Sequence, residues 1–158
     1  MPAHTFDYLS PGPEQTRRLG QRLGALLQPG DVICLQGDLG AGKTTFVQGL
    51  AQGWNSLDAV SSPTFVIVNV YRRADGGRLF HLDTYRLDSA LEAEELDLDA
   101  MLQQGPLVIE WPERMASVLP AERLWVALEY IDDTSRSLRF RSQGVHYQEL
   151  LAKITTTG

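Results

Sequence analysis

The stretch that decides the fold reads Val32-Ile33-Cys34-Leu35-Gln36-Gly37-Asp38-Leu39-Gly40-Ala41-Gly42-Lys43-Thr44. Its first four residues are apolar without a break, which is typical of a short strand buried on both faces of a sheet. Its last eight match the pattern G-x-x-x-x-G-K-[ST] of the phosphate-binding loop, or P-loop. A helix is predicted to follow over residues 44–52. Strand, glycine-rich loop and helix in this order are the context in which the motif binds phosphate.

The residue types in the loop fit this chemistry. Glycines permit backbone dihedral angles that turn successive N–H groups inward around phosphate oxygens. The N-terminal end of the following helix adds a partial positive charge. We expect Lys43 to contact the β- and γ-phosphates and the hydroxyl of Thr44 to bind Mg²⁺. The sequence therefore predicts a site for a nucleoside triphosphate with Mg²⁺. It lacks the Asn-Lys-x-Asp stretch with which Ras-type GTPases read guanine, which favours adenine and hence ATP.

Two acidic residues are candidates to complete the metal site. Asp83 follows the strand-like run Leu79-Phe80-His81-Leu82, and Glu110 follows the apolar run Leu107-Val108-Ile109. One of them can hold Mg²⁺ while the other orients the attacking water or senses the γ-phosphate. Each also has a plainer interpretation as a solvent-exposed residue at the end of a strand. The pattern alone does not rank the two carboxylates.

The remaining chain predicts one α/β domain over residues 1–158, because 158 residues are enough for one domain but not for two ordinary ones. Strands are expected at 4–9, 65–71, 78–82 and 106–111, with an antiparallel C-terminal hairpin formed by 124–130 and 138–140. Helices are expected from residue 13 or 14, within 90–104, and at 145–154. Together these elements predict a P-loop NTPase-like mixed sheet with helices on both faces.

Charge bears on the partners. The chain has 14 basic and 20 acidic residues and a net charge of −6. A protein that binds nucleic acid unaided usually has a basic face, which this composition does not indicate. Residues 87–113 contain acidic side chains but no Lys, Arg or His. This acidic stretch is interpreted either as a solvated face or as a docking surface for a basic partner.

Composition also bears on location. No apolar run approaches the roughly 18 residues of a membrane span, and the first ten residues do not resemble a secretory signal. The single cysteine, Cys34, has no partner for a disulfide within the chain, so a reducing, cytoplasmic location is expected. Cys34, His81, Trp54 and Trp125 are expected to pack or to hydrogen-bond inside the fold rather than to act chemically.

Four segments together carry a family resemblance. They are Gly37-Asp38-Leu39-Gly40-Ala41-Gly42-Lys43-Thr44-Thr45-Phe46, Ser62-Pro63-Thr64-Phe65, His81-Leu82-Asp83-Thr84-Tyr85-Arg86-Leu87 and Glu110-Trp111-Pro112-Glu113, in that order. With them the chain resembles the TsaE family, bacterial ATPases of tRNA threonylcarbamoyladenosine biosynthesis, along nearly its whole length. The P-loop is generic, whereas the other three segments are far more specific.

The resemblance implies a small Mg²⁺-dependent ATPase that binds the TsaB–TsaD complex. Its ATP hydrolysis would support threonylcarbamoylation of the tRNA adenosine next to the anticodon, although the transferase is another subunit. It implies weak hydrolysis by the protein alone and stronger hydrolysis with the partners. Contact with tRNA would be indirect, through the complex.

The resemblance also implies roles for single residues. Glu110 matches the second Mg²⁺ ligand beside Thr44, and Asp83 matches an acidic residue near the γ-phosphate that is needed for hydrolysis. Thr64 falls in a switch-like segment after the P-loop helix. Trp111 lies beside the nucleotide. With Lys43, these are the residues expected to act on ATP.

Further residues are expected at the nucleotide by the same comparison. Thr45 continues the P-loop, and Thr16 and Arg136 resemble positions that flank the base. Family members often have glycine before the arginine that Arg136 matches, and here that residue is Ser135. This departure concerns the contact from the C-terminal hairpin and leaves the phosphate site unaffected.

Two alternatives to a partner-dependent ATPase remain. One is a small-molecule P-loop kinase, which would need a mobile lid with arginines that clamp the transition state. Arg72, Arg73 and Arg78 are the only arginine cluster in roughly the right region, and they flank an ordinary hairpin turn. The other is an assembly module that nucleotide binding alone switches, without hydrolysis.

Overall fold

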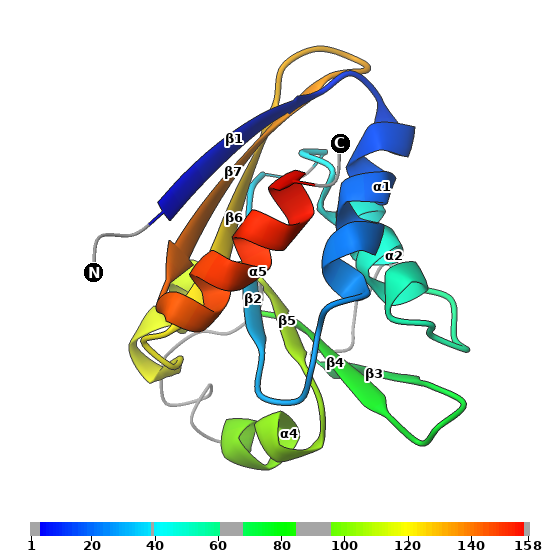
Figure 1. Ribbon diagram of the computed structural model, residues 1–158, viewed down its shortest axis with the longest axis vertical. Coiled ribbons are helices and arrows are strands. Elements are labelled where there is room, and N and C mark those ends of the chain that lie inside the picture. Colours follow the sequence, from blue (N-terminus) through cyan, green and yellow to red (C-terminus); the bar gives the residue numbers. More distant parts are fainter. Residues whose placement is uncertain (1–3, 39, 61–67, 85–95, 157–158) are drawn as a thin grey trace.

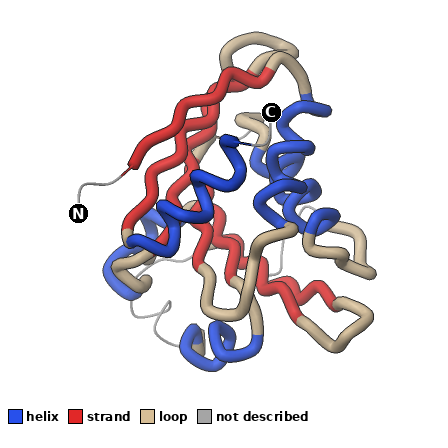
Figure 2. Tube along the Cα trace, in the orientation of Figure 1, coloured by secondary structure: helices blue, strands red, loops and turns tan. Residues whose placement is uncertain are grey.

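The computed structural model describes residues 4–38, 40–60, 68–84 and 96–156. Within them, seven strands form one sheet in the order β1-β7-β6-β2-β5-β4-β3 (Figures 1 and 2). The strands are β1 (His4–Ser10), β2 (Val32–Gln36), β3 (Val68–Arg72), β4 (Arg78–Asp83), β5 (Leu107–Glu110), β6 (Arg123–Tyr130) and β7 (Arg136–Gln143). The helices are α1 (Pro13–Gly24), α2 (Lys43–Gly53), α4 (Leu98–Gln104) and α5 (Val145–Thr156), with short 3-10 turns at Pro112–Arg114 and Ala116–Val118.

The sheet has a parallel centre and antiparallel margins. β6, β2, β5 and β4 run parallel, whereas β1 and β7 on one side and β3 on the other are antiparallel to their neighbours. The predicted mixed sheet and its antiparallel C-terminal hairpin, β6 with β7, are therefore confirmed. Because the carboxyl ends of parallel strands meet at one edge, the loop after β2 and the ends of β4 and β5 lie together there.

The central strand β2 is buried on both faces, as predicted. Its residues 32–35 are at most 1% exposed. Ile33 and Leu35 belong to an apolar cluster with side chains of α1, α2 and α5, which lie over one face of the sheet (Figure 1). Val32 and Cys34 belong to a second cluster with Leu98 of α4 and residues of the 3-10 turns. Since successive side chains of a strand point to opposite faces, helices cover both faces.

Most predicted elements match those observed. The strand expected at 65–71 is observed as β3, and its residues 65–67 lie outside the described residues. The helix expected within 90–104 is observed as α4, and residues 90–95 likewise lie outside them. The packing predictions for Cys34 and Trp54 are confirmed, because both are buried in the apolar clusters. Trp125 is half-buried against the second cluster, and its indole N–H donates to Gln36 at 2.7 Å.

Helices α1 and α2 pack backbone against backbone. A Cβ atom added to Gly49 of α2 would lie 2.2 Å from the carbonyl oxygen of Arg17, and one added to Gly24 of α1 would lie 2.1 Å from that of Leu50. Such distances leave no room for a side chain, so glycine is required at both positions. This contact fixes α2, and with it the side chains of its first turn, against the rest of the fold.

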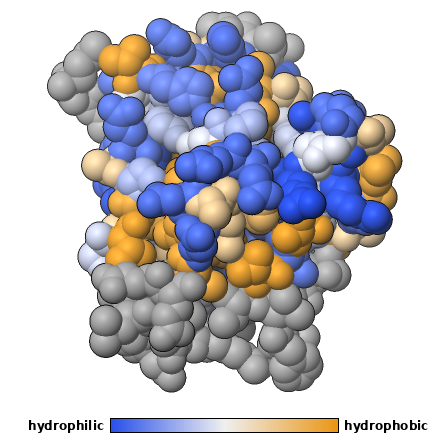
Figure 3. All heavy atoms as spheres, turned by 90° about the horizontal axis from the view of Figure 1, so that it is seen from below, coloured by the Kyte–Doolittle hydropathy of each residue, from blue (hydrophilic) through white to orange (hydrophobic). Residues whose placement is uncertain are grey.

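The surface offers no simple indication of function. Figure 3 shows hydrophilic and hydrophobic side chains interspersed over one face of the molecule. The described helices include none with the length and apolar character needed to cross a bilayer. The motif residues, and not a surface patch, therefore mark the candidate site.

Candidate nucleotide-binding site

The glycine-rich loop joins the end of β2 to the start of α2 at the carboxyl edge of the sheet. Gly40 and Gly42 have φ angles of +84° and +101°, which residues with a Cβ rarely adopt. The N–H of Ala41 donates to the carbonyl of Asp38 at 3.0 Å, and that of Phe46 to Gly42 at 3.0 Å. Leu39 lies outside the described residues. The left-handed glycines give the loop the sharp turn that an anion-binding concavity needs.

Lys43 is the first residue of α2 and is buried. It is 6% exposed, and its Nζ has no hydrogen-bond partner among the residues that the structure describes. Nζ lies 3.7 Å from the centroid of the Trp111 ring. Burial lowers the pKa of Lys43, and nearby carboxylates, led by that of Glu110 and then Asp83, act in the opposite direction. A buried ammonium group without a bonded acceptor is costly, so this position fits a phosphate oxygen.

The structure brings the two candidate carboxylates together. Asp83 and Glu110 are the last residues of β4 and β5 and lie opposite each other in the parallel register. Glu110 also lies opposite Leu35, one residue before the end of β2. Glu110 is 6% exposed and Asp83 is half-buried. The acidic pair therefore lies next to the loop, where its charge acts on Lys43.

The protein side chains alone do not make a metal site. Across the described ranges, no group of three or more His, Cys, Asp and Glu side chains lies close enough to hold an ion. Thr44 is exposed in the first turn of α2. A hydroxyl, a carboxylate and phosphate oxygens are the hard ligands that Mg²⁺ accepts, and it usually keeps several waters. The residues present thus fit a Mg²⁺ site whose remaining ligands are phosphate oxygens and water.

Sequence reasoning did not identify three side chains that support Glu110. His81 is 1% exposed, and its Nε2 lies 2.6 Å from Oε2 of Glu110. Its Nδ1 lies 2.8 Å from the hydroxyl of Tyr71. The hydroxyl of Thr84 lies within donating distance of the carbonyl oxygens of Glu110 and Trp111, at 2.8 and 2.6 Å. The prediction that His81 is a packed, hydrogen-bonded residue is confirmed, although its partner Glu110 could not be read from the pattern.

Three residues expected at the nucleotide line one pocket. Thr16, Thr45 and Arg136 lie around a cavity of about 100 Å³ beside Gly42. Nε of Arg136 donates to the carbonyl of Gly40 at 3.0 Å, so the C-terminal hairpin touches the glycine-rich loop directly. The change to Ser135 does not prevent this contact. Thr16 itself is buried, with its hydroxyl 2.7 Å from that of Ser10.

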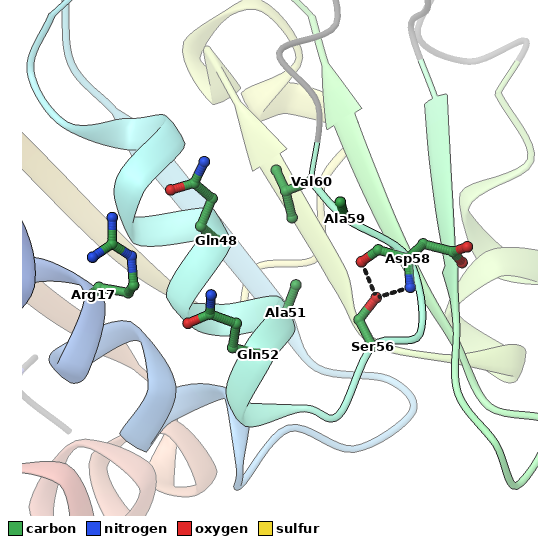
Figure 4. A pocket seen from close by; sticks show the side chains of 8 residues that line it. All are labelled: Arg17, Gln48, Ala51, Gln52, Ser56, Asp58, Ala59 and Val60. Carbon is green, nitrogen blue, oxygen red and sulfur yellow. Dashed lines mark hydrogen bonds between the residues drawn. The ribbon is translucent and has the colours of Figure 1, made fainter.

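A larger cavity lies elsewhere. A pocket of about 430 Å³ is formed by α1, α2 and residues 56–60 (Figure 4). Its lining residues are Arg17, Gln48, Ala51, Gln52, Ser56, Asp58, Ala59 and Val60. None of these was predicted as a site residue. Of the remaining predictions, Thr64 and the first part of the acidic stretch, residues 87–95, lie outside the described residues.

Comparisons with known proteins agree with the arrangement of the motifs. The family model described as "Threonylcarbamoyl adenosine biosynthesis protein TsaE" matches residues 10–138. The chain is 39% identical over 145 residues to the tRNA threonylcarbamoyladenosine biosynthesis protein TsaE of Bacillus subtilis, covering 90% of this chain and 89% of the relative. It is 44% identical over 126 residues to the protein of that name from Streptomyces coelicolor, covering 78% and 85%.

A solved structure is similar over almost the whole chain. The crystal structure of Bacillus subtilis YdiB superimposes with a TM-score of 0.79 at 32% identity and covers 97% of this chain and 95% of that one. The fold, the order of the motifs and the sequence matches thus agree. The chain belongs to the TsaE family.

Proposed function

We propose that the chain is a Mg²⁺-dependent ATPase that acts in the biosynthesis of threonylcarbamoyladenosine in tRNA. The observation that carries the proposal is the ammonium group of Lys43, buried at the end of a glycine-rich loop without a bonded acceptor among the described residues. The pathway follows from family membership, since the relatives are named for it.

Different groups of the chain have different roles toward ATP. The N–H groups of the loop and the N-terminal end of α2 bind phosphate oxygens. Lys43 then exchanges the Trp111 ring for the β- and γ-phosphates and stabilises the negative charge that the transferred phosphoryl group carries in the transition state. Binding of ATP thereby gives the buried ammonium group the partners that it lacks.

Thr44 and Glu110 would hold Mg²⁺, which when bound neutralises charge on the phosphate oxygens. Asp83 lies opposite Glu110 in the register and is the remaining carboxylate of the pair. It orients the attacking water or accepts its proton. Division of the pair into a ligand and a water-handling group agrees with their different burial, because Glu110 is buried and Asp83 is half-buried.

The partners follow from the family resemblance, which implies the TsaB–TsaD complex. The net charge of −6 supports contact with tRNA through that complex rather than by this chain alone. Asp83 and the segment around Thr64 would respond to the γ-phosphate, which hydrolysis removes. The resulting change in their conformation would alter the affinity for the complex.

The arginines that a kinase lid would need each contact a protein side chain near the β3–β4 hairpin. Arg72 pairs with Asp58 at 2.8 Å, and Arg73 pairs with Asp75 at 2.9 Å. Arg78 donates to Gln104 at 3.1 Å. These contacts hold the β3–β4 hairpin in place, which favours transfer of the phosphoryl group to water over transfer to a small-molecule acceptor.

The test is ATP turnover by the purified protein, alone and with added TsaB–TsaD. We expect turnover that the complex stimulates and that Lys43→Ala abolishes. Lys153→Ala is the matched control, because Lys153 is the only other lysine and lies on α5. Binding of ATP without turnover in either condition would contradict hydrolysis and leave the kinase and the assembly module to be separated by a screen of acceptors.

A further inference from the structure

A chain of buried hydrogen bonds runs across three strands and ends at Glu110. Tyr71 on β3, His81 on β4 and Glu110 on β5 are 3%, 1% and 6% exposed. The hydroxyl of Tyr71 lies 2.8 Å from Nδ1 of His81, and Nε2 of His81 lies 2.6 Å from Oε2 of Glu110. A polar chain at this depth needs every member bonded, so its geometry is tightly specified.

The direction of each bond follows from the groups. An ionised carboxylate only accepts, so Nε2 of His81 carries the hydrogen and donates to Glu110. In the neutral imidazole Nδ1 is then the acceptor, and the hydroxyl of Tyr71 donates to it. Burial raises the pKa of Tyr71 to about 12, which keeps that hydroxyl protonated. The Glu110 carboxylate thereby selects the tautomer of His81 that donates to it, and Tyr71 bonds the other ring nitrogen.

We propose that His81 is a positioning residue that holds the Glu110 carboxylate for Mg²⁺, and that Tyr71 supports it by bonding Nδ1 and so restraining the imidazole ring. This inference rests on the proposed function. The side chain of His81 bonds one carboxylate oxygen of Glu110, while the hydroxyl of Thr84 bonds its backbone carbonyl. Glu110 is therefore held at two points, from β4 and from the residue that follows it, so its carboxylate is in place before the metal binds.

Two substitutions of His81 separate positioning from packing. In His81→Gln the amide nitrogen takes the place of Nε2, so the donor to Glu110 is kept. In His81→Asn the amide takes the place of Nδ1, so the contact with Tyr71 is kept and the donor to Glu110 is lost. Both variants are smaller than histidine and polar, so a role in packing alone predicts similar losses for the two.

The measurement is ATP binding by calorimetry over a range of Mg²⁺ concentrations. For His81→Asn we expect a rise of about 10- to 100-fold in the Mg²⁺ concentration that gives half of the metal's effect on ATP binding. This is the usual loss of metal affinity when a group that orients a metal ligand is removed. Affinity for ATP without Mg²⁺ should stay close to wild type, because the loop and Lys43 are unchanged. His81→Gln should recover most of the loss, and Tyr71→Phe should show a smaller rise than His81→Asn.

A matched control is available in His146. Its Nε2 lies 2.6 Å from Oδ1 of Asp31, the same kind of pair, but on α5 away from the glycine-rich loop. His146→Asn should leave the Mg²⁺ dependence unchanged. If His81→Asn does not fold, Tyr71→Phe carries the test, because it removes only the hydroxyl that bonds Nδ1 of His81.

The outcomes distinguish this inference from the proposed function. A wild-type protein whose ATP binding is indifferent to Mg²⁺ overturns the metal site and this inference with it. If ATP binding by the wild type depends on Mg²⁺ and His81→Asn shows the same dependence, only the proposed role of His81 is overturned. Equal losses in His81→Asn and His81→Gln also overturn it, in favour of packing.

Discussion

The ammonium group of Lys43 lies over the face of the Trp111 ring, 3.7 Å from its centroid. Trp111 has a φ angle of +60°, and the hydroxyl of Thr84, within donating distance of its carbonyl oxygen, helps to hold it in this uncommon conformation. A cation over an indole ring gains on the order of 1 kcal/mol. Charge-assisted hydrogen bonds to phosphate are stronger, so a nucleotide can draw Lys43 away from the ring.

This relationship predicts an optical signal for ATP binding. When Lys43 exchanges the ring for phosphate, the surroundings of Trp111 change, so ATP should alter the tryptophan emission. Trp111→Phe should remove the ATP-dependent change, whereas Trp125→Phe should keep it, because Trp125 lies in the second apolar cluster. An ATP-dependent change that survives in Trp111→Phe would show that the nucleotide does not act on the Lys43–Trp111 contact.

Arg136 should contribute to affinity through the loop. Its Nε donates to the carbonyl of Gly40, and it lines the cavity beside Gly42. Hydrogen bonds from charged groups contribute about 1.5–3 kcal/mol, so Arg136→Ala should raise the Kd for ATP by about 10-fold or more. Arg139→Ala is the control, because Arg139 is exposed on the same strand and pairs with Asp7. Equal Kd values for the two variants, measured by calorimetry, would place the base elsewhere.

Asp83 should matter for the chemical step more than for binding. If it orients or deprotonates the attacking water, Asp83→Asn should lower kcat by about 10²- to 10⁴-fold while ATP still binds. Asp99→Asn, an exposed position in the first turn of α4, should behave as wild type. Steady-state turnover together with calorimetric binding separates the two effects. Retention of kcat in Asp83→Asn would assign the water to another group.

Cys34 should be unreactive in the folded protein. Burial raises the pKa of its thiol to about 12, so the nucleophilic thiolate is absent at pH 8. A thiol-specific disulfide reagent should leave the native protein unmodified and should modify it in urea. Modification of the native protein at the rate seen in urea would contradict the burial of this strand.

The same shift gives stability a pH dependence. An unfolded cysteine loses its proton near pH 8.5, whereas the folded thiol keeps it up to about pH 12. The folded state therefore binds more protons between these values, and the free energy of unfolding should fall as the pH rises through that window. Urea unfolding at several pH values checks this, and the slope should be smaller in Cys34→Ala.

The local elements of this fold were predictable because their signals are local. The unbroken apolar run in β2, the glycines before Lys43 and the alternation in β6 and β7 each lie within a few residues. The glycine-rich loop between β2 and α2 was predictable for the same reason, since one motif contains the turn, the cation and the hydroxyl.

The features that could not be predicted are contacts between residues far apart in the sequence, because they depend on which strands become neighbours in the sheet. The register that places Asp83 opposite Glu110 joins residues of separate strands, and so does the bond from His81 to Glu110. The close approach of α1 and α2 was missed as well. Glycine in a helix is usually interpreted as lowering the stability of that helix, not as a point of contact with another helix. Sequence periodicity reports which face of an element is apolar, but it does not report the partner across the sheet.

The proposed function depends on Lys43, which would bind the phosphates of ATP together with Mg²⁺. The most direct test is calorimetric titration of ATP in the presence of Mg²⁺ into wild-type protein, Lys43→Ala and Lys153→Ala. We expect saturable binding to wild type and to Lys153→Ala with similar Kd values, and binding to Lys43→Ala that is weaker by at least about 10-fold, or about 1.4 kcal/mol. Equal binding by all three proteins would contradict it.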